Sequence, residues 1–118
     1  MAEFQITTST NNNIEELLLH GYLDAHTAPQ LEAAIGVLVQ QGKYNILVNF
    51  RELDYISSAG LGVFMVFIEE VRNNNGDIKL CEMKPKVYTV FDLLGFPMLF
   101  EILPTSQEAT DKFTTTNG

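Results

Sequence analysis

The feature that most constrains the fold of this chain is the alternation of short apolar runs with longer segments of helical periodicity. Residues 44–50, YNILVNF, form a brief apolar run with β-branched content, which favours a buried strand over a helix. Residues 59–76 then carry apolar side chains at helical spacing and end in an Asn-rich loop, which predicts a helix. Because strands and helices alternate in this way in crossover folds, the centre of the chain predicts a sheet with parallel neighbours.

The flanking segments extend this alternation toward both ends. Residues 4–10 and 15–22 are strand-like and are separated by turn-prone asparagines, which predicts a hairpin. Thr27 and Gln30 then form a capping-box pattern before a helix that ends at Gly42. The later segments predict a strand, a helix, a short strand and a weak last helix, at residues 78–81, 85–94, 100–103 and 106–113 in that order.

Together these elements predict a single α/β domain. We expect a mixed sheet of four to five strands with an N-terminal hairpin and three to four helices, over residues 4–113. A length of 118 residues suits one domain with one core. Residues 114–118 are expected to form a flexible tail.

The charge balance limits the partners that the chain can take. Seven basic and fifteen acidic residues give a net charge of −8, which opposes binding to nucleic acid and to anionic membrane surfaces. A protein partner with a basic patch is easier to accommodate. The chain has no apolar run near the ~20 residues that cross a bilayer, and its first residues lack the pattern of a secretory signal, so we expect a cytoplasmic protein.

The sequence offers little support for catalysis. Asp24 and Asp54 are the candidates for a metal-binding or acid–base pair, but no histidine or third acidic ligand completes them. The stretch around Ser57 and Ser58 supplies neither a nucleophile elbow nor a P-loop. Cys81 lies in a strand-like segment and is expected to be a small buried filler. We therefore expect no enzyme, no metal and no cofactor.

Residues 53–62, LDYISSAGLG, place two adjacent hydroxyls between a predicted strand and a predicted helix. Loops at the carboxyl ends of parallel strands are common binding sites. A serine N-cap accounts for one hydroxyl, either Ser57 or Ser58. The alternative is phosphorylation, because a helix N-terminus accepts the added negative charge while a docking edge would be changed by it. Gly60 and Gly62 allow close approach of another backbone or serve helix packing.

The chain resembles the STAS domain, and specifically the small stand-alone anti-sigma-factor antagonists. The resemblance rests on D-x-I-S-S-A-G-L-G at 54–62, GYLDAHTAP at 21–29 and VFDLLGF at 90–96, and it covers residues 4–113. It implies a STAS-like fold in which Ser58 is phosphorylated, with Ser57 as the second choice. Many members have aspartate before this serine and serine, threonine or glycine after it, where this chain has Ser57 and Ala59.

The resemblance also implies a partner switch. The unmodified protein binds an anti-sigma factor that is a serine kinase and displaces a sigma factor; phosphorylation at Ser58 ends the complex, and a phosphoserine phosphatase restores the cycle. The alternative is a STAS scaffold subunit of a stress-sensor or lipid-transport assembly that is not phosphorylated. The expected partner-binding residues are this loop, the upstream aspartate and one apolar residue of the next helix: Asp24, Asp54, Ser57, Ser58, Ala59, Gly60, Leu61 and Val63.

Overall fold

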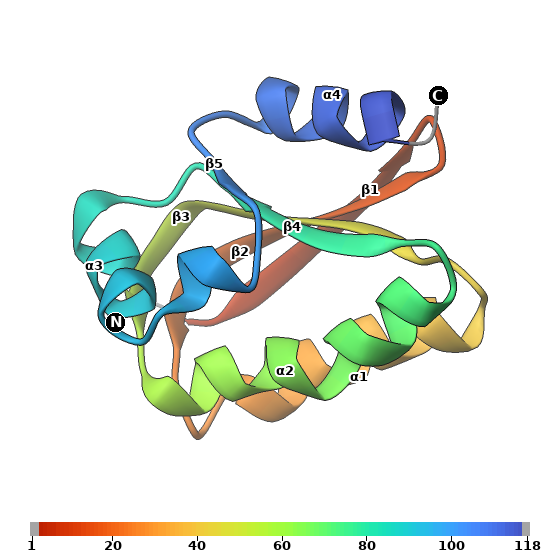
Figure 1. Cartoon of the computed structure of the whole chain (residues 1–118). Helices are drawn as coiled ribbons and strands as arrows, with labels where there is room; N and C mark the ends of the chain where they lie inside the picture. The colour runs from red at the N-terminus through yellow and green to blue at the C-terminus, as the bar shows by residue number, and fades with distance from the viewer. Residues whose placement is uncertain (1–2, 117–118) are drawn as a thin grey trace.

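The chain begins with the predicted hairpin (Figure 1). The computed structural model describes residues 3–116, with side chains through residue 113. Strand β1 (Gln5–Asn11) pairs antiparallel with β2 (Ile14–Leu23) in an unbroken register. Asn12 and Asn13 join them with positive φ angles of 52° and 66°, and a two-residue turn of this hand matches the twist of the strands that it connects.

The sheet continues with three parallel pairings. Its order is β1-β2-β3-β4-β5, with β3 at Asn45–Ile56, β4 at Asp77–Cys81 and β5 at Ile102–Leu103. Each of β3, β4 and β5 runs parallel to the strand before it, so the predicted mixed sheet is confirmed.

Strand β3 is longer than the sequence pattern predicts, because it continues past residue 50 to Ile56. The polar residues after position 50 interrupt the apolar run, yet Leu53 and Ile56 are buried and still face the core. They pair with Gly21 and Leu23 of β2 through an irregular register. The second half of β3 has one polar face, so the continuous apolar run ends before the strand does. The predicted end of β3 at residue 50 is therefore too early.

Helices α1 (Ala28–Gln40) and α2 (Ser58–Asn73) cover one face of the sheet, and the main core lies beneath them (Figure 1). Helix α3 (Pro85–Leu93) and the short 3₁₀ helix η1 (Phe96–Met98) close one side of this core. The sequence analysis did not predict η1. A connected cluster of aromatic rings joins α2, α3 and η1 to β3, and its members are Phe50, Phe64, Phe91, Phe96 and Phe100.

Helix α4 (Ser106–Thr116) lies on the opposite face of the sheet and covers a smaller core (Figure 1). Ala109 and Phe113 of α4 pack there against Leu47 and Cys81. Burial raises the pKa of the Cys81 thiol to about 12, so Cys81 is the buried filler that the sequence predicts. Residues 114–116, which the sequence analysis places in the tail, continue α4, and residues 117–118 lie outside the described residues. Within residues 3–116, every helix is too short or too polar to span a bilayer.

Candidate functional site

The candidate site lies where β2 and β3 end side by side. Leu23 and Ile56 are partners in the parallel register, and each is followed by a loop that leads into a helix. The backbone N–H of Ser57 donates to the carbonyl of Leu23 at 2.9 Å, so the two loops are joined directly. The structure therefore brings the Asp24 loop and the two serines to one edge of the sheet, as the sequence analysis expects of strand ends in this fold.

Asp24 organises its own loop. Its carboxylate Oδ1 accepts hydrogen bonds from the backbone N–H groups of His26 at 2.9 Å and Thr27 at 3.2 Å. The hydroxyl of Thr27 accepts the N–H of Asp24 and donates to the carbonyl of Tyr22, each at 2.9 Å. The predicted capping box of Thr27 and Gln30 is wrong, because the Thr27 oxygen turns back toward the end of β2 and makes no cap bond.

The two serines have different surroundings. Ser57 holds the N-cap position of α2 with extended backbone, but its side chain makes no cap hydrogen bond. Its Oγ is buried and has no hydrogen-bond partner among the described residues. Ser58 is the first residue of α2 and is exposed, as is Ala59. Side-chain capping therefore does not account for Ser57, and the accessible hydroxyl at the helix N-terminus belongs to Ser58.

The next residues of the motif, from Gly60 to Val63, pack the start of α2 against the end of β2 and the core. A Cβ at Gly60 would lie 2.7 Å from Cγ of Leu23, so glycine is needed for α2 to approach the end of β2. Leu61 and Val63 are 2% and 3% exposed and belong to the core. In the isolated chain Leu61 and Val63 face the core, and their contact with a partner stays a prediction. A nearly all-apolar helix gives little indication of its outer face, and the exposed large apolar residues of α2 prove to be Met65 and Val66.

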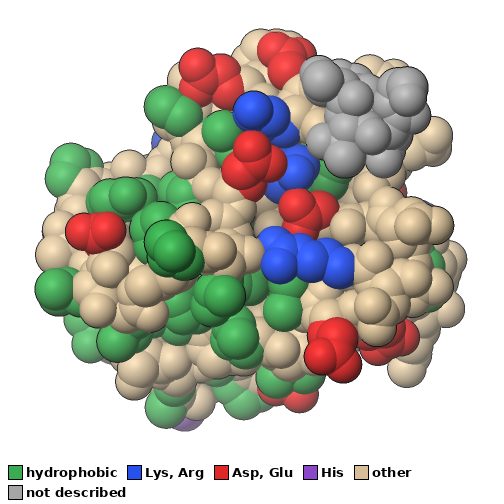
Figure 2. Space-filling model, viewed as in Figure 1, with side chains coloured by type: hydrophobic (Ala, Val, Ile, Leu, Met, Phe, Trp, Pro, Cys, Tyr) green, Lys and Arg blue, Asp and Glu red, His purple; other side chains and the backbone are tan. Residues whose placement is uncertain are grey.

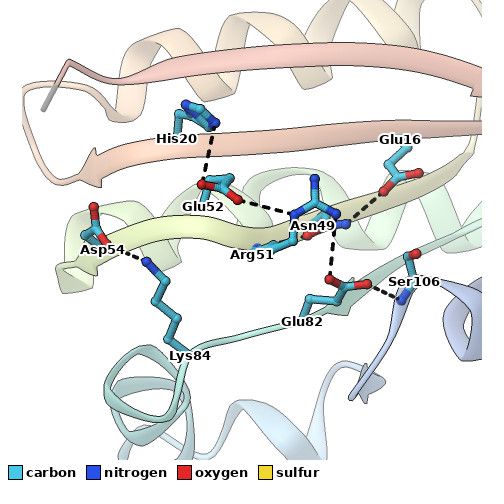
Figure 3. A network of polar contacts seen from close by, with 9 residues as sticks. All are labelled: Glu16, His20, Asn49, Arg51, Glu52, Asp54, Glu82, Lys84 and Ser106. Atoms are coloured by element: carbon cyan, nitrogen blue, oxygen red, sulfur yellow. Dashed lines mark hydrogen bonds and ion pairs between the residues drawn. The ribbon is translucent and has the colours of Figure 1, made fainter.

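Asp54 is paired within the chain. Its carboxylate accepts a hydrogen bond from Nζ of Lys84, the residue before α3 (Figure 3). The hydrogen bond and charge of Lys84 hold the pKa of Asp54 below its ordinary value. The sequence analysis missed Lys84, because a contact across 30 residues leaves no local pattern.

A polar network crosses β3 on the face of the sheet that α4 covers, and it reaches the start of α4 (Figure 3). The buried Asn49 donates to Glu16 at 3.0 Å and accepts the backbone N–H of Arg51 at 2.9 Å. Arg51 lies 3.9 Å from Glu82, which accepts the N–H of Ser106 at the start of α4. This network fixes α4 on the sheet. Within residues 3–116 no cluster of three or more His, Cys, Asp or Glu side chains is arranged to hold a metal ion.

Two further surfaces are visible in Figure 2. Apolar side chains gather over α3 and η1, where Leu93 is 79% and Met98 89% exposed. Basic and acidic side chains alternate between α2 and α4, where ion pairs join Arg72 to Asp77, and Lys79 to Asp77 and Glu101. Neither surface contains the candidate serines.

Comparison with known proteins decides the family. The family model of the STAS domain matches residues 5–109. The chain belongs to the STAS domain family. A relative from Bordetella bronchiseptica, provisionally named anti-sigma factor antagonist BtrV, is 36% identical to this STAS protein over 97 residues, which cover 82% of this chain and 84% of that protein.

Solved STAS structures agree with the fold of this STAS protein. An anti-sigma factor antagonist from Mycobacterium paratuberculosis superposes with a TM-score of 0.87 at 20% identity, covering 95% of each chain, which shows the shared fold. The Bacillus cell fate determinant SpoIIAA in its phosphorylated form is 27% identical with a TM-score of 0.70, covering 93% of this chain and 98% of that one.

Proposed function

We propose that this STAS protein is an anti-sigma factor antagonist that binds an anti-sigma factor with serine kinase activity and is switched off by phosphorylation at Ser58. The observation that carries the proposal is the exposed hydroxyl of Ser58 at the first position of α2, beside the buried hydroxyl of Ser57. The names of the relatives support an anti-sigma factor as the partner. The phosphorylated form of a structural neighbour supports modification of this kind of domain.

A phosphate at Ser58 changes binding without breaking the fold. The free N–H groups and the dipole at the start of α2 stabilise an added anion. The phosphate adds about −1.5 to −2 charge to an edge that already carries Asp24 and Asp54. Burying that charge in an interface that formed around a neutral hydroxyl is costly, and we expect affinity to fall on the order of 10²- to 10³-fold, a few kcal/mol.

The switch then works as a cycle. The unmodified protein holds the anti-sigma factor through Ser58, Ala59 and the neighbouring Asp24 loop, so that a sigma factor is released. Transfer of a phosphoryl group from ATP by that kinase ends the complex, and a phosphoserine phosphatase restores the binding form. The net charge of −8 favours a basic protein surface as partner over nucleic acid or a membrane, in keeping with a cytoplasmic regulator.

The test is intact-mass spectrometry of the full chain incubated with ATP and the serine-kinase anti-sigma factors of the same cell. Wild type and Ser57→Ala should each gain one phosphate, and Ser58→Ala should gain none. A phosphate that persists in Ser58→Ala would show that another residue is modified. Tight binding without any phosphate transfer would favour the scaffold function instead.

A further inference from the structure

Strand β1 leaves one edge of the sheet open. It pairs with β2 on one side and is the first strand in the sheet order. It spans seven residues in unbroken register, and most of its side chains are exposed. The opposite edge differs, because β5 has only two residues and Leu103 packs against the core beneath α4. The unprotected strand edge of this sheet is therefore β1.

The hairpin geometry determines which backbone groups of β1 face outward. A two-residue loop at Asn12 and Asn13 makes the residues that flank it a hydrogen-bonded pair. Because this pairing alternates along the strands, the odd-numbered residues of β1 bond to β2. Ile6, Thr8 and Thr10 therefore direct their N–H and C=O groups away from the sheet.

The open edge carries no charge, in a chain with a net charge of −8. Residues 5–11, QITTSTN, include no lysine, carboxylate or proline, which are the residues that usually protect an edge from pairing. The nearest carboxylates on β2 are held inside the chain. Glu15 accepts a hydrogen bond from Thr10 at 2.8 Å, and Glu16 accepts one from Asn49 at 3.0 Å.

A groove lies beside this edge, between β1 and α1. Its volume is about 560 Å³. It is lined by Thr8, Ser9 and Thr10 of β1, by Ala34, Val37 and Leu38 of α1, and by the polar or charged Glu15, Gln41 and Lys43. Val37 is 51% exposed there. A strand added to β1 would therefore find backbone partners at the edge. Side chains that point toward α1 would meet the apolar Ala34, Val37 and Leu38 next to the polar Gln41 and Lys43.

We propose that β1 pairs antiparallel with β1 of a second copy of this chain, about a two-fold axis at Thr8. Thr8 then lies opposite Thr8 of the second copy, and Ile6 opposite Thr10, with about six backbone hydrogen bonds between the outward groups. Residues directly opposite in antiparallel strands point to the same face, so Ile6 of each copy lies toward the groove beside Val37 of the other.

A second copy fits this edge because the arrangement is self-complementary. Two chains of charge −8 repel one another. Because β1 contains no carboxylate, pairing through β1 does not place carboxylates of the two strands opposite each other. In this register Gln5 lies opposite Asn11 and Thr7 opposite Ser9. The pairing uses the flank of the sheet and leaves the Ser58 edge of both copies open, so it does not depend on the proposed switch.

The first test compares two substitutions at Thr8 by sedimentation equilibrium of the full chain. Proline at this position removes an outward N–H and leaves the bonds to β2 intact, whereas alanine keeps the N–H. Wild type and Thr8→Ala should approach twice the monomer mass with rising concentration. Thr8→Pro, folded as judged by circular dichroism, should dimerise at least about tenfold more weakly, which corresponds to a loss of about 1.4 kcal/mol.

The second test is cross-linking. Cα atoms of a hydrogen-bonded antiparallel pair lie about 5.5 Å apart, within the range of a disulfide. Thr8→Cys should form a covalent dimer under mild oxidation, while Gln107→Cys on the exposed side of α4 should not, and Cys81 is buried in both. A monomeric mass up to about 1 mM, a dimer that Thr8→Pro leaves intact, or no cross-link at position 8 would each overturn the proposal.

Discussion

Ser57 and Ser58 are adjacent in the chain but differ in exposure. The Oγ of Ser57 is buried without a hydrogen-bond partner among the described residues, and Ser58 is exposed one residue later. A kinase reaches an exposed hydroxyl without unfolding the helix. The buried hydroxyl of Ser57 is instead a cost to the fold, because it loses its hydration and gains no bond.

Ser57→Ala should therefore stabilise the protein. Removing a buried unpaired hydroxyl should raise the free energy of unfolding by about 1 kcal/mol. Ser58→Ala serves as the control, because an exposed substitution should change it by less than about 0.5 kcal/mol. Urea unfolding followed by circular dichroism measures both values. A loss of stability in Ser57→Ala would mean that its hydroxyl makes a bond in solution.

Lys84 should control the titration of Asp54. In Lys84→Gln the pKa of Asp54, followed by NMR, should rise toward its ordinary value of 3.8. Lys86→Gln is the matched control, because the charge of Lys86 lowers the same pKa less than Lys84 does. Since the folded pKa lies below the unfolded one, the pair stabilises the fold above about pH 4, and this stability is lost as pH falls through the lowered pKa. An unchanged Asp54 titration in Lys84→Gln would refute the pairing.

Residue roles were predictable from sequence only where they depend on near neighbours. The pattern around residues 57–58 identifies the loop but leaves open which serine caps the helix, and only the resemblance to the STAS family singles out Ser58. The burial of Val63 was not predictable, because α2 has apolar residues on most of its surface. The partner of Asp54 was not predictable either, since Lys84 reaches it from a separate element.

At the scale of elements, α2 contains a matched pair of glycines with opposite consequences. Gly60→Ala places a Cβ 2.7 Å from Leu23 and should destabilise the protein by about 1–3 kcal/mol. Gly62→Ala has nothing within 4 Å and should stabilise it by about 0.5–1 kcal/mol, because alanine favours the helix. Denaturant unfolding of both variants measures the difference. A Gly60→Ala variant as stable as the wild type would contradict the close packing of α2 on β2.

Apart from η1, the existence and order of the elements followed from hydrophobic periodicity and turn residues, whereas their ends did not. Strand β3 carries core residues such as Leu53 on one face and polar residues such as Arg51 on the other, so its second half lacks a continuous apolar run. The Asp24 carboxylate holds the turn before α1, and the predicted cap at Thr27 is not formed. Contacts with β2 determine both the end of β3 and the start of α1. The residues next to each boundary in the sequence do not reveal these contacts.

At the scale of the whole molecule, the fold separates the surfaces that binding would use. The Ser58 edge lies at the ends of β2 and β3, the open strand β1 lies on the flank, and α4 closes the opposite face (Figure 1). A charge added at Ser58 therefore acts on one edge and leaves the others as they were. The net charge of −8, in contrast, affects the approach of any charged partner, whichever surface it binds.

That net charge should make capture of a basic anti-sigma factor depend on salt. We expect the association rate constant to fall about tenfold between about 0.05 and 0.5 M NaCl, because screening shortens the reach of the attraction. The dissociation rate constant should change less than about twofold, since the proposed complex is held by close contacts at the Ser58 edge. Stopped-flow mixing measures both, with an uncharged osmolyte at equal osmolality as control. An association rate that salt leaves unchanged would mean that the acidic surface does not steer the partner, and that the Ser58 edge recognises it through short-range contacts alone.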